Sequence, residues 1–277
     1  MQESRKAGGV NGLGTLPAAA RRLLLSCAWA ATSHAQATRG TDDSARVMLQ
    51  KFGDAWRGRE ELALDESLVL GFWVEGPGGG EYHTVLSAEA GARVDDGIPQ
   101  AWDLGFALDM DFLRKLDNGE MSALTSMGQA RSNDAIPLVP RFGPDFQQNP
   151  DAGLLFRRVS FHFWTRSWPE TVPFGEHAAR FVHGGNASVL LYDDEFRSAW
   201  YQLKPGMHIN PDPQDQVNDF PQLLIITRGE FTGRFDGQSR ILSEGEAVFI
   251  PPGMAHEFWA DEHGYGEFVW MAFGDGA

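Results

Sequence analysis

The chain has 277 residues, of which 42% are hydrophobic and 22% charged, the composition of a folded globular protein and not of a disordered chain. Its formal net charge of -15 argues against nucleic acid as a partner, because binding to phosphates depends on Lys and Arg. The single cysteine, Cys27, excludes an internal disulfide and a cysteine-based zinc site.

The first 41 residues have the order of a secretory signal. Arg21 and Arg22 precede an apolar run at 23–31, and Ser33 and Ala35 follow at the spacing of a cleavage site. A signal predicts a periplasmic or secreted protein, whereas the alternative, a disordered tail, predicts a cytoplasmic one. The run is shorter than the roughly 20 residues that a membrane-spanning helix needs, so we expect no integral membrane association.

Residues 42–136 predict an α+β domain. Met48, Phe52 and Trp56 recur every four residues and indicate a helix over 44–57. A glycine-rich turn joins strands at 67–74 and 81–86, and further strands near 92–94 and 102–108 would complete a small antiparallel sheet. Helical spacing then returns at 110–116, which ends at Asn118-Gly119, and at 121–127. These helices would cover the sheet.

This order of elements resembles the sterol-carrier-protein domain family, in which an apolar ligand lies between a sheet and its helices. The resemblance implies lipid binding in an apolar tunnel, although side chains of this kind also fill an ordinary core. The tunnel would be lined by Phe72, Val74, Leu104, Phe106, Leu113, Leu116, Met121 and Leu124.

A linker is expected at 137–153, where Pro, Gly, Asn and Gln are dense, and an all-β domain at 154–277. Short β-type runs lie at 154–163, 187–192, 198–203, 222–227, 231–235, 247–250 and 267–273, separated by turns, which predicts a barrel or sandwich. The run 154–164 would supply an edge strand through which two copies pair as a homodimer.

A spaced motif points to one barrel family. Gly245, Pro251, Gly253 and His256 have the spacing of the second conserved motif of cupins, with Ala260 where that family usually has Asn. Gln222 and Gly229 have the spacing between the glutamate and the glycine of the first motif. The region therefore resembles the RmlC-like cupin superfamily, and the resemblance implies a cupin β-barrel.

The resemblance also implies a degenerate metal site. The family's His, His, Glu and His positions correspond here to Gln216, Asn218, Gln222 and His256. Neutral amides are weak ligands for iron, manganese or zinc, so we expect no resident cofactor. If a divalent metal is bound, His256 and His208 are the expected ligands, the latter by moving in from the insertion before Gln216.

Two functions follow from these patterns. The first is a small-molecule binding protein, with an apolar ligand in the N-terminal domain and a polar one held by Gln216, Asn218, Gln222 and His256. The second is a cupin metalloenzyme, a dioxygenase or isomerase, acting on a hydrophobic substrate. His177 and His183 are either surface residues or part of the barrel mouth.

Overall fold

The computed structural model describes residues 44–58, 67–131, 134–166 and 169–277. The predicted signal or tail, with Cys27, lies outside the described residues. The predictions of localisation depend on that segment and stay predictions. From Asp42 onward the chain forms one compact unit. Among the described residues no helix is both long and apolar enough to cross a membrane.

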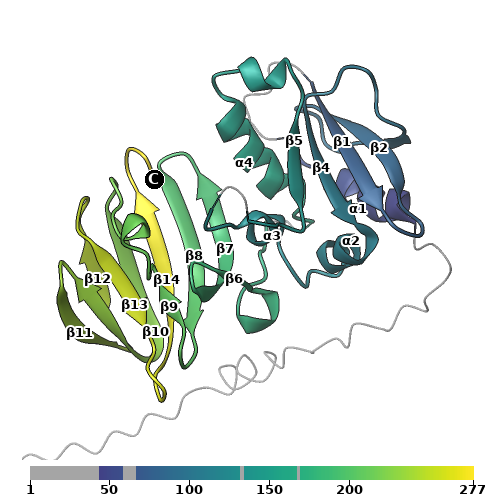
Figure 1. The fold of residues 1–277 in the computed structure, drawn as a ribbon. Coiled ribbons are helices and arrows are strands. Elements are labelled where there is room, and N and C mark those ends of the chain that lie inside the picture. Colours follow the sequence, from purple (N-terminus) through teal and green to yellow (C-terminus); the bar gives the residue numbers. More distant parts are fainter. Residues whose placement is uncertain (1–43, 59–66, 132–133, 167–168) are drawn as a thin grey trace, which may run out of the picture. The chain divides into compact units, whose positions relative to one another are not determined.

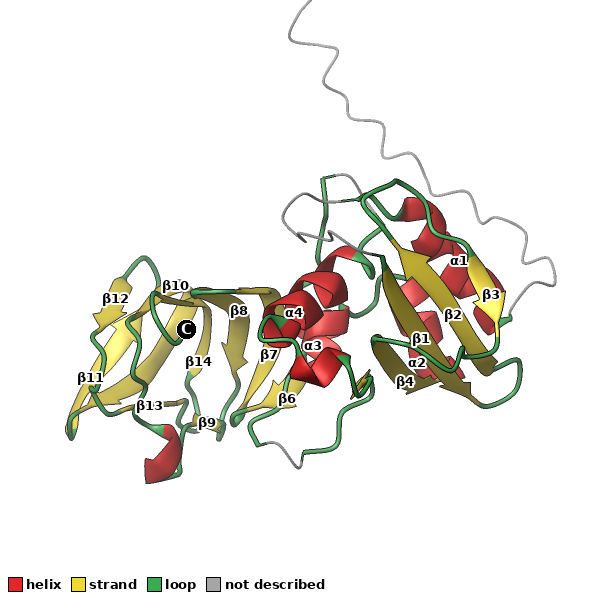
Figure 2. Ribbon diagram, turned by 90° about the horizontal axis from the view of Figure 1, so that it is seen from above, coloured by secondary structure: helices red, strands yellow, loops and turns green. Residues whose placement is uncertain are grey.

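The N-terminal region contains a five-stranded mixed sheet with helices (Figures 1 and 2). Its strands lie in the order β3-β2-β1-β4-β5. The bounds are β1 Leu68–Glu75, β2 Gly80–Leu86, β3 Val94–Asp96, β4 Leu104–Asp109 and β5 Val139–Phe142, with helices α1 Ala45–Ala55, α2 Met110–Asp117, α3 Ala123–Met127 and α4 Ala152–His162.

One face of this sheet carries the N-terminal core. Alternate residues of β1, including Leu70 and Phe72, pack with Phe52 of α1, Leu113 of α2 and Val159 of α4. The helices α1, α2 and α4 therefore cover the same face, because each contributes its apolar side to one cluster. The predicted helices and the β1–β2 hairpin are confirmed within a few residues.

Three expectations for this region are wrong. The sheet is mixed and not antiparallel, because β1 and β4 pair in parallel, with Phe72 opposite Phe106. Residues 139–142, expected in a linker, form β5 and pair with β4. The expected edge strand at 154–163 is α4, because Leu155, Val159 and Phe163 recur every four residues and pack on the core. The strand proposed for pairing two copies therefore does not exist.

The C-terminal region is a nine-stranded curled sheet, the form expected of a cupin barrel (Figure 1). Its main path is β6-β7-β8-β14-β10-β13-β9, and β11 and β12 also pair with β10. The bounds are β6 Arg180–Val182, β7 Gly185–Asp193, β8 Phe196–Leu203, β9 His208–Ile209, β10 Gln222–Phe235, β11 Gln238–Ser243, β12 Ala247–Ile250, β13 His256–Trp259 and β14 Tyr265–Phe273, with short 3-10 turns η4 Glu176–Ala178 and η5 Pro213–Asp215. A further 3-10 turn, η3 Phe146–Gln148, lies between β5 and α4 in the N-terminal region.

Strand β10 organises this region. The two predicted strands 222–227 and 231–235 are one continuous strand, irregular where its pairing with β14 shifts between Ile226 and Arg228. Residues 228–230, which lie between the two predicted strands, pair with β14 beyond this irregularity, and Gly229 has a positive φ of 71°. The apolar interior, which includes Leu224, Phe258 and Phe268, fills the space between the sheet's curled halves.

Candidate functional site

The curled sheet encloses a cavity of about 210 Å³. Residues that alternate along three strands face it, namely Arg197 and Tyr201 of β8, His256 and Phe258 of β13, and Phe268 and Trp270 of β14, because side chains point to one face of a strand at every second position. The complete lining is His183, Arg197, Tyr201, Ile209, Asn210, Asp215, Asn218, Phe220, Gln222, His256, Phe258, Phe268 and Trp270.

A directional chain of hydrogen bonds crosses one wall of this cavity. The Nε1–H of Trp270 donates to Oε1 of Gln222 at 2.6 Å, and Nε2 of Gln222 lies 3.3 Å from Nε2 of His256. The Nδ1 atom of His256 lies 3.0 Å from the carbonyl oxygen of Met254. An indole nitrogen is only a donor, so Gln222 must present its NH₂ group to His256. Nε2 of His256 is then the acceptor, and Nδ1 carries the proton.

This chain is compatible only with a neutral His256. Protonation would place an N–H on Nε2, against the NH₂ donor of Gln222. The ring is 2% exposed, and burial lowers the pKa of His256 below its ordinary value, although the bond to the Met254 carbonyl acts in the opposite direction. Both ring nitrogens are therefore occupied within the protein.

The residues present do not fit the divalent metal that the cupin resemblance implies. Within the described ranges, no three side chains of His, Cys, Asp or Glu form a group that could hold a metal ion. His256 is the only imidazole of the expected four, and its Nε2 atom already accepts a hydrogen bond from Gln222. The amides Asn218 and Gln222 add only weak neutral oxygen donors.

Arg197 brings a positive charge to the cavity. Its guanidinium stacks on the rings of Tyr192 and Phe220, at 4.6 and 5.4 Å from their centroids, and its Nη2 atom reaches the Gly276 carbonyl at 3.4 Å. Among the described residues its Nε–H is buried and has no hydrogen-bond partner. An aromatic-stacked guanidinium presents its N–H edge to an oxyanion.

Tyr201, on the same face of β8 as Arg197, supplies a neutral hydroxyl to the cavity. Its ring stacks on Phe268, with the centroids 5.3 Å apart and the planes 11° apart. Burial raises the pKa of Tyr201 to about 12, so its hydroxyl stays protonated and available as a donor. The sequence patterns assigned no functional role to Arg197, Tyr201 or Trp270. Their alternate spacing on β8 and β14 was the available signal.

The structure brings together three of the four predicted barrel ligands. Asn218, Gln222 and His256 line the cavity. The side chain of Gln216 instead donates to the Asn210 carbonyl at 3.1 Å, so this amide closes the inserted loop. His183 also lines the cavity, and its burial lowers the pKa of its imidazole.

His208 lies on the opposite side of β13 from His256. Its Nε2 atom is 2.6 Å from Oε2 of Glu257, and its ring packs beside Trp259. Glu257 is 3% exposed and also pairs with Arg234. Successive residues of β13 face opposite sides, so Glu257 holds His208 away from the cavity in which it was expected to help bind a metal.

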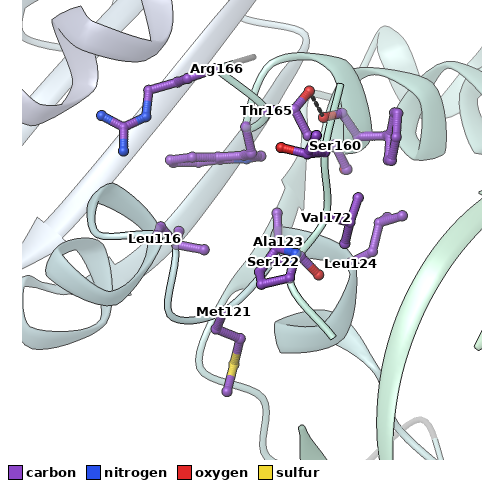
Figure 3. Close-up of a pocket in the computed structure, with 14 residues that line it drawn as sticks. Leu116, Met121, Ser122, Ala123, Leu124, Ser160, Thr165, Arg166 and Val172 are labelled. Carbon is purple, nitrogen blue, oxygen red and sulfur yellow. Dashed lines mark hydrogen bonds between the residues drawn. The ribbon is translucent and has the colours of Figure 1, made fainter. Parts of the chain in front are cut away.

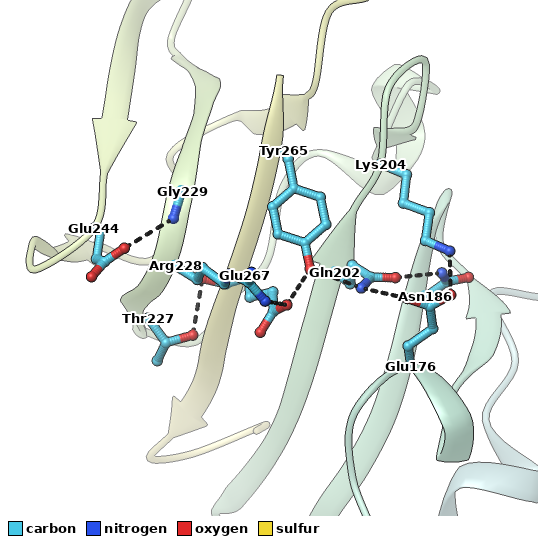
Figure 4. A network of polar contacts seen from close by, with 10 residues as sticks. All are labelled: Glu176, Asn186, Gln202, Lys204, Thr227, Arg228, Gly229, Glu244, Tyr265 and Glu267. Atoms are coloured by element: carbon cyan, nitrogen blue, oxygen red, sulfur yellow. Dashed lines mark hydrogen bonds and ion pairs between the residues drawn. The ribbon is translucent and has the colours of Figure 1, made fainter. Parts of the chain in front are cut away.

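A second polar network lies on the face of β8 that is turned away from the cavity (Figure 4). The amide of the buried Gln202 accepts from Asn186 at 2.9 Å and donates to Tyr265 at 3.1 Å and to Glu176 at 3.3 Å. The Tyr265 hydroxyl in turn donates to Glu267. All hydrogen-bonding atoms of the Gln202 amide are thus paired, and we assign the network a structural role in fixing the η4 segment against the sheet.

The eight predicted tunnel residues divide into two groups. Phe72, Val74, Leu104, Phe106 and Leu113 are buried members of the N-terminal core. Leu116, which is also a member of this core, lines a separate cavity beside α3 and α4 together with Met121 and Leu124.

The comparisons with known proteins concern the C-terminal region. The Cupin domain family matches residues 199–272. Among solved structures, a cupin 2 conserved barrel domain protein from Salinispora arenicola is 18% identical, over 38% of this chain and 89% of that one, with a TM-score of 0.34. An RmlC-like cupin from Shewanella frigidimarina is 19% identical, over 38% and 90%, with a TM-score of 0.31.

A third solved structure, the polyketide cyclase RemF from Streptomyces resistomycificus, is 17% identical over 37% of this chain and 79% of that one, with a TM-score of 0.32. No curated protein matches the chain by sequence. The family match and the barrel topology confirm a C-terminal cupin domain, as the spaced glycines and proline predicted. The resemblance of the N-terminal region to the sterol-carrier family finds no support in these comparisons.

Proposed function

We propose that the cupin domain is a non-catalytic binding domain, which holds a small polar molecule with an oxyanion group and needs no metal ion. The observation that carries this proposal is the hydrogen-bond chain from Trp270 through Gln222 to His256. It occupies both nitrogens of the imidazole that would otherwise act as a metal ligand or a general base. The cavity can therefore bind a ligand through hydrogen bonds, without metal ligation or proton transfer by His256.

The lining of the cavity defines the class of ligand. Arg197 offers an unpaired N–H for a carboxylate or similar oxyanion, and the Tyr201 hydroxyl and the Asn218 amide offer neutral hydrogen bonds. Phe268 and Trp270 supply apolar surface for the rest of the molecule. The volume of about 210 Å³ is below that of pockets for drug-sized ligands, so the ligand is a small hydroxy acid or aromatic acid.

Calorimetric titration of the full chain tests the ligand class. We expect small acids such as malate or benzoate to bind, and their uncharged counterparts glycerol and benzamide to bind far more weakly. Arg197→Gln should weaken acid binding by about tenfold or more, because a hydrogen bond to a charged group contributes about 1.5–3 kcal/mol. Arg228→Gln is the control, since Arg228 lies at the surface beside Glu267. Equal binding by both variants would contradict the role of Arg197.

Elemental analysis separates this proposal from the alternative of a cupin dioxygenase or isomerase. The protein is expressed with added iron, manganese or zinc and then dialysed. We expect far less than one metal ion per chain. Near-stoichiometric metal that disappears in His256→Ala would favour the metalloenzyme and overturn the binding-domain proposal.

A further inference from the structure

A cavity of about 490 Å³ lies in the N-terminal region, between the segment that joins α2 to α3, the helices α3 and α4, and residues 171–173 (Figure 3). This volume is in the range of ordinary small-molecule sites. Much of the lining is apolar and comes from Leu116, Met121, Leu124, Phe161, Val172 and Pro173. The thioether of Met121 is flexible and adapts to apolar ligands of different shape.

Two buried hydrogen-bonding groups that line this cavity lack partners among the described residues. Ser160 of α4 is 0% exposed and Trp164 is 7% exposed, yet neither the Ser160 Oγ nor the Trp164 Nε1 has a hydrogen bond. Buried polar groups of this kind are normally paired, because an unpaired donor loses its hydration without compensation. A bound molecule with an acceptor oxygen would satisfy both groups.

Comparable side chains elsewhere in the protein are paired. Ser126, also 0% exposed, donates to the Ala123 carbonyl at 2.5 Å. The buried Trp56 donates its Nε1–H to the Ser87 carbonyl at 3.0 Å, and Trp270 donates to Gln222. Among the described residues, the other buried side-chain atoms without a partner are the Nε atoms of Arg157 and Arg197, so no other buried serine or tryptophan atom shares this state.

The charged residue among those that line this cavity is a cation, Arg166. Arg166, which also lines the cavity, lies 2.9 Å from Asp117, and Lys51 lies 2.7 Å from the same carboxylate. Two cations share one anion, so this cluster has a net positive charge. In Figure 3, Ser160, Thr165 and Arg166 lie on one side of the cavity and Met121 on the other.

We propose that this cavity binds a small amphiphilic carboxylate. Its apolar chain lies among Leu116, Met121 and Val172, and a carboxylate oxygen accepts from Ser160 and Trp164 on the side where Arg166 adds positive charge. This site is separate from the barrel cavity, and neither proposal depends on the other.

The test is calorimetric titration of the full chain with three eight-carbon probes. Octanoate offers a charged acceptor, methyl octanoate a neutral acceptor, and octyltrimethylammonium none. We expect octanoate to bind most tightly and octyltrimethylammonium not to bind. Octanoate that fails to bind, or a cationic probe that binds as well, would overturn the proposal.

Matched variants locate the probe. Ser160→Ala should weaken octanoate binding by at least about fivefold, since it removes one hydrogen bond to a charged group. Ser126→Ala, the buried serine outside the cavity, should leave it unchanged. Val172→Phe fills the cavity from a non-helical segment and should abolish binding, which tests the location without changing either donor. Unchanged affinity in Ser160→Ala and Val172→Phe would show that octanoate binds elsewhere and would overturn the proposal.

Discussion

Replacing Gln222 by Glu replaces the hydrogen-bond donor that faces His256 Nε2 with an acceptor. One carboxylate oxygen can still accept from the Trp270 indole, as Oε1 of Gln222 does at 2.6 Å. The other replaces the NH₂ group that now lies 3.3 Å from His256 Nε2. That nitrogen would then face an acceptor and not a donor. The variant should therefore hold His256 in its protonated form, paired with Glu.

The size of the change in the pKa of His256 can be worked out from the distance between residue 222 and the imidazole. Opposite unit charges separated by 3.3 Å attract by about 5 kcal/mol when the effective dielectric constant is about 20. Desolvation of the new carboxylate offsets part of this, since a buried ion pair recovers only a fraction of its attraction. If about 2 kcal/mol remains, protonation of His256 is favoured more than tenfold over the wild type. The pKa of His256, which burial lowers in the wild type, should rise.

Proton–carbon NMR of the His256 Cε1–H group across a pH titration measures this directly, with His208 as an internal reference on the opposite side of β13. The same variant restores one carboxylate and one imidazole donor side by side, so zinc or manganese affinity should increase above that of the wild type. A pKa of His256 that is unchanged or lower in Gln222→Glu would refute the assigned direction of the hydrogen-bond chain.

Three further outcomes are expected. Burial lowers the pKa of His256 in the folded state, so the unfolded state takes up a proton first as the pH falls. The free energy of unfolding should therefore decrease as the pH falls below about 6.5. Urea unfolding between pH 7.5 and 5 should show a smaller decrease in His256→Gln than in the wild type. Glu257→Ala should cost about 2–3 kcal/mol in the same assay, because it removes a buried carboxylate that pairs with both His208 and Arg234. The exposed Arg240→Gln should cost under about 0.5 kcal/mol. Gly229→Ala should lower the thermal midpoint, because φ is 71° there and a Cβ would collide with the Tyr265 carbonyl; an unchanged midpoint would show that β10 relaxes at its irregularity.

Local patterns in the N-terminal region predicted most elements but not how they assemble. The four-residue spacing of Met48, Phe52 and Trp56 required a helix with one apolar side. The same spacing was present at Leu155, Val159 and Phe163, but the apolar run there was interpreted as a strand, since a short apolar run suits either element. The parallel pairing of β1 with β4 depends on a long connection, and no local signal encodes it.

In the barrel, the sequence identifies the cupin motif more completely than it identifies the residues that line the cavity. The glycines and proline of the cupin motif act through backbone conformation, as at Gly245 and Gly253 with positive φ, so their spacing alone identified the domain. The structure places Gln222 and His256 in the lining of one cavity, at positions that the motif spacing defines.

The sequence alone determined the fold class of both regions, the cupin domain and the lack of a full set of strong metal donors, since these depend on residue type and spacing. Only the tertiary structure decided that Trp270 orients the Gln222 amide, that Arg197 enters the cavity and that Glu257 holds His208 outside it. The direction of a hydrogen bond depends on which partner the folded chain places on the other side, and strands distant in sequence supply those partners.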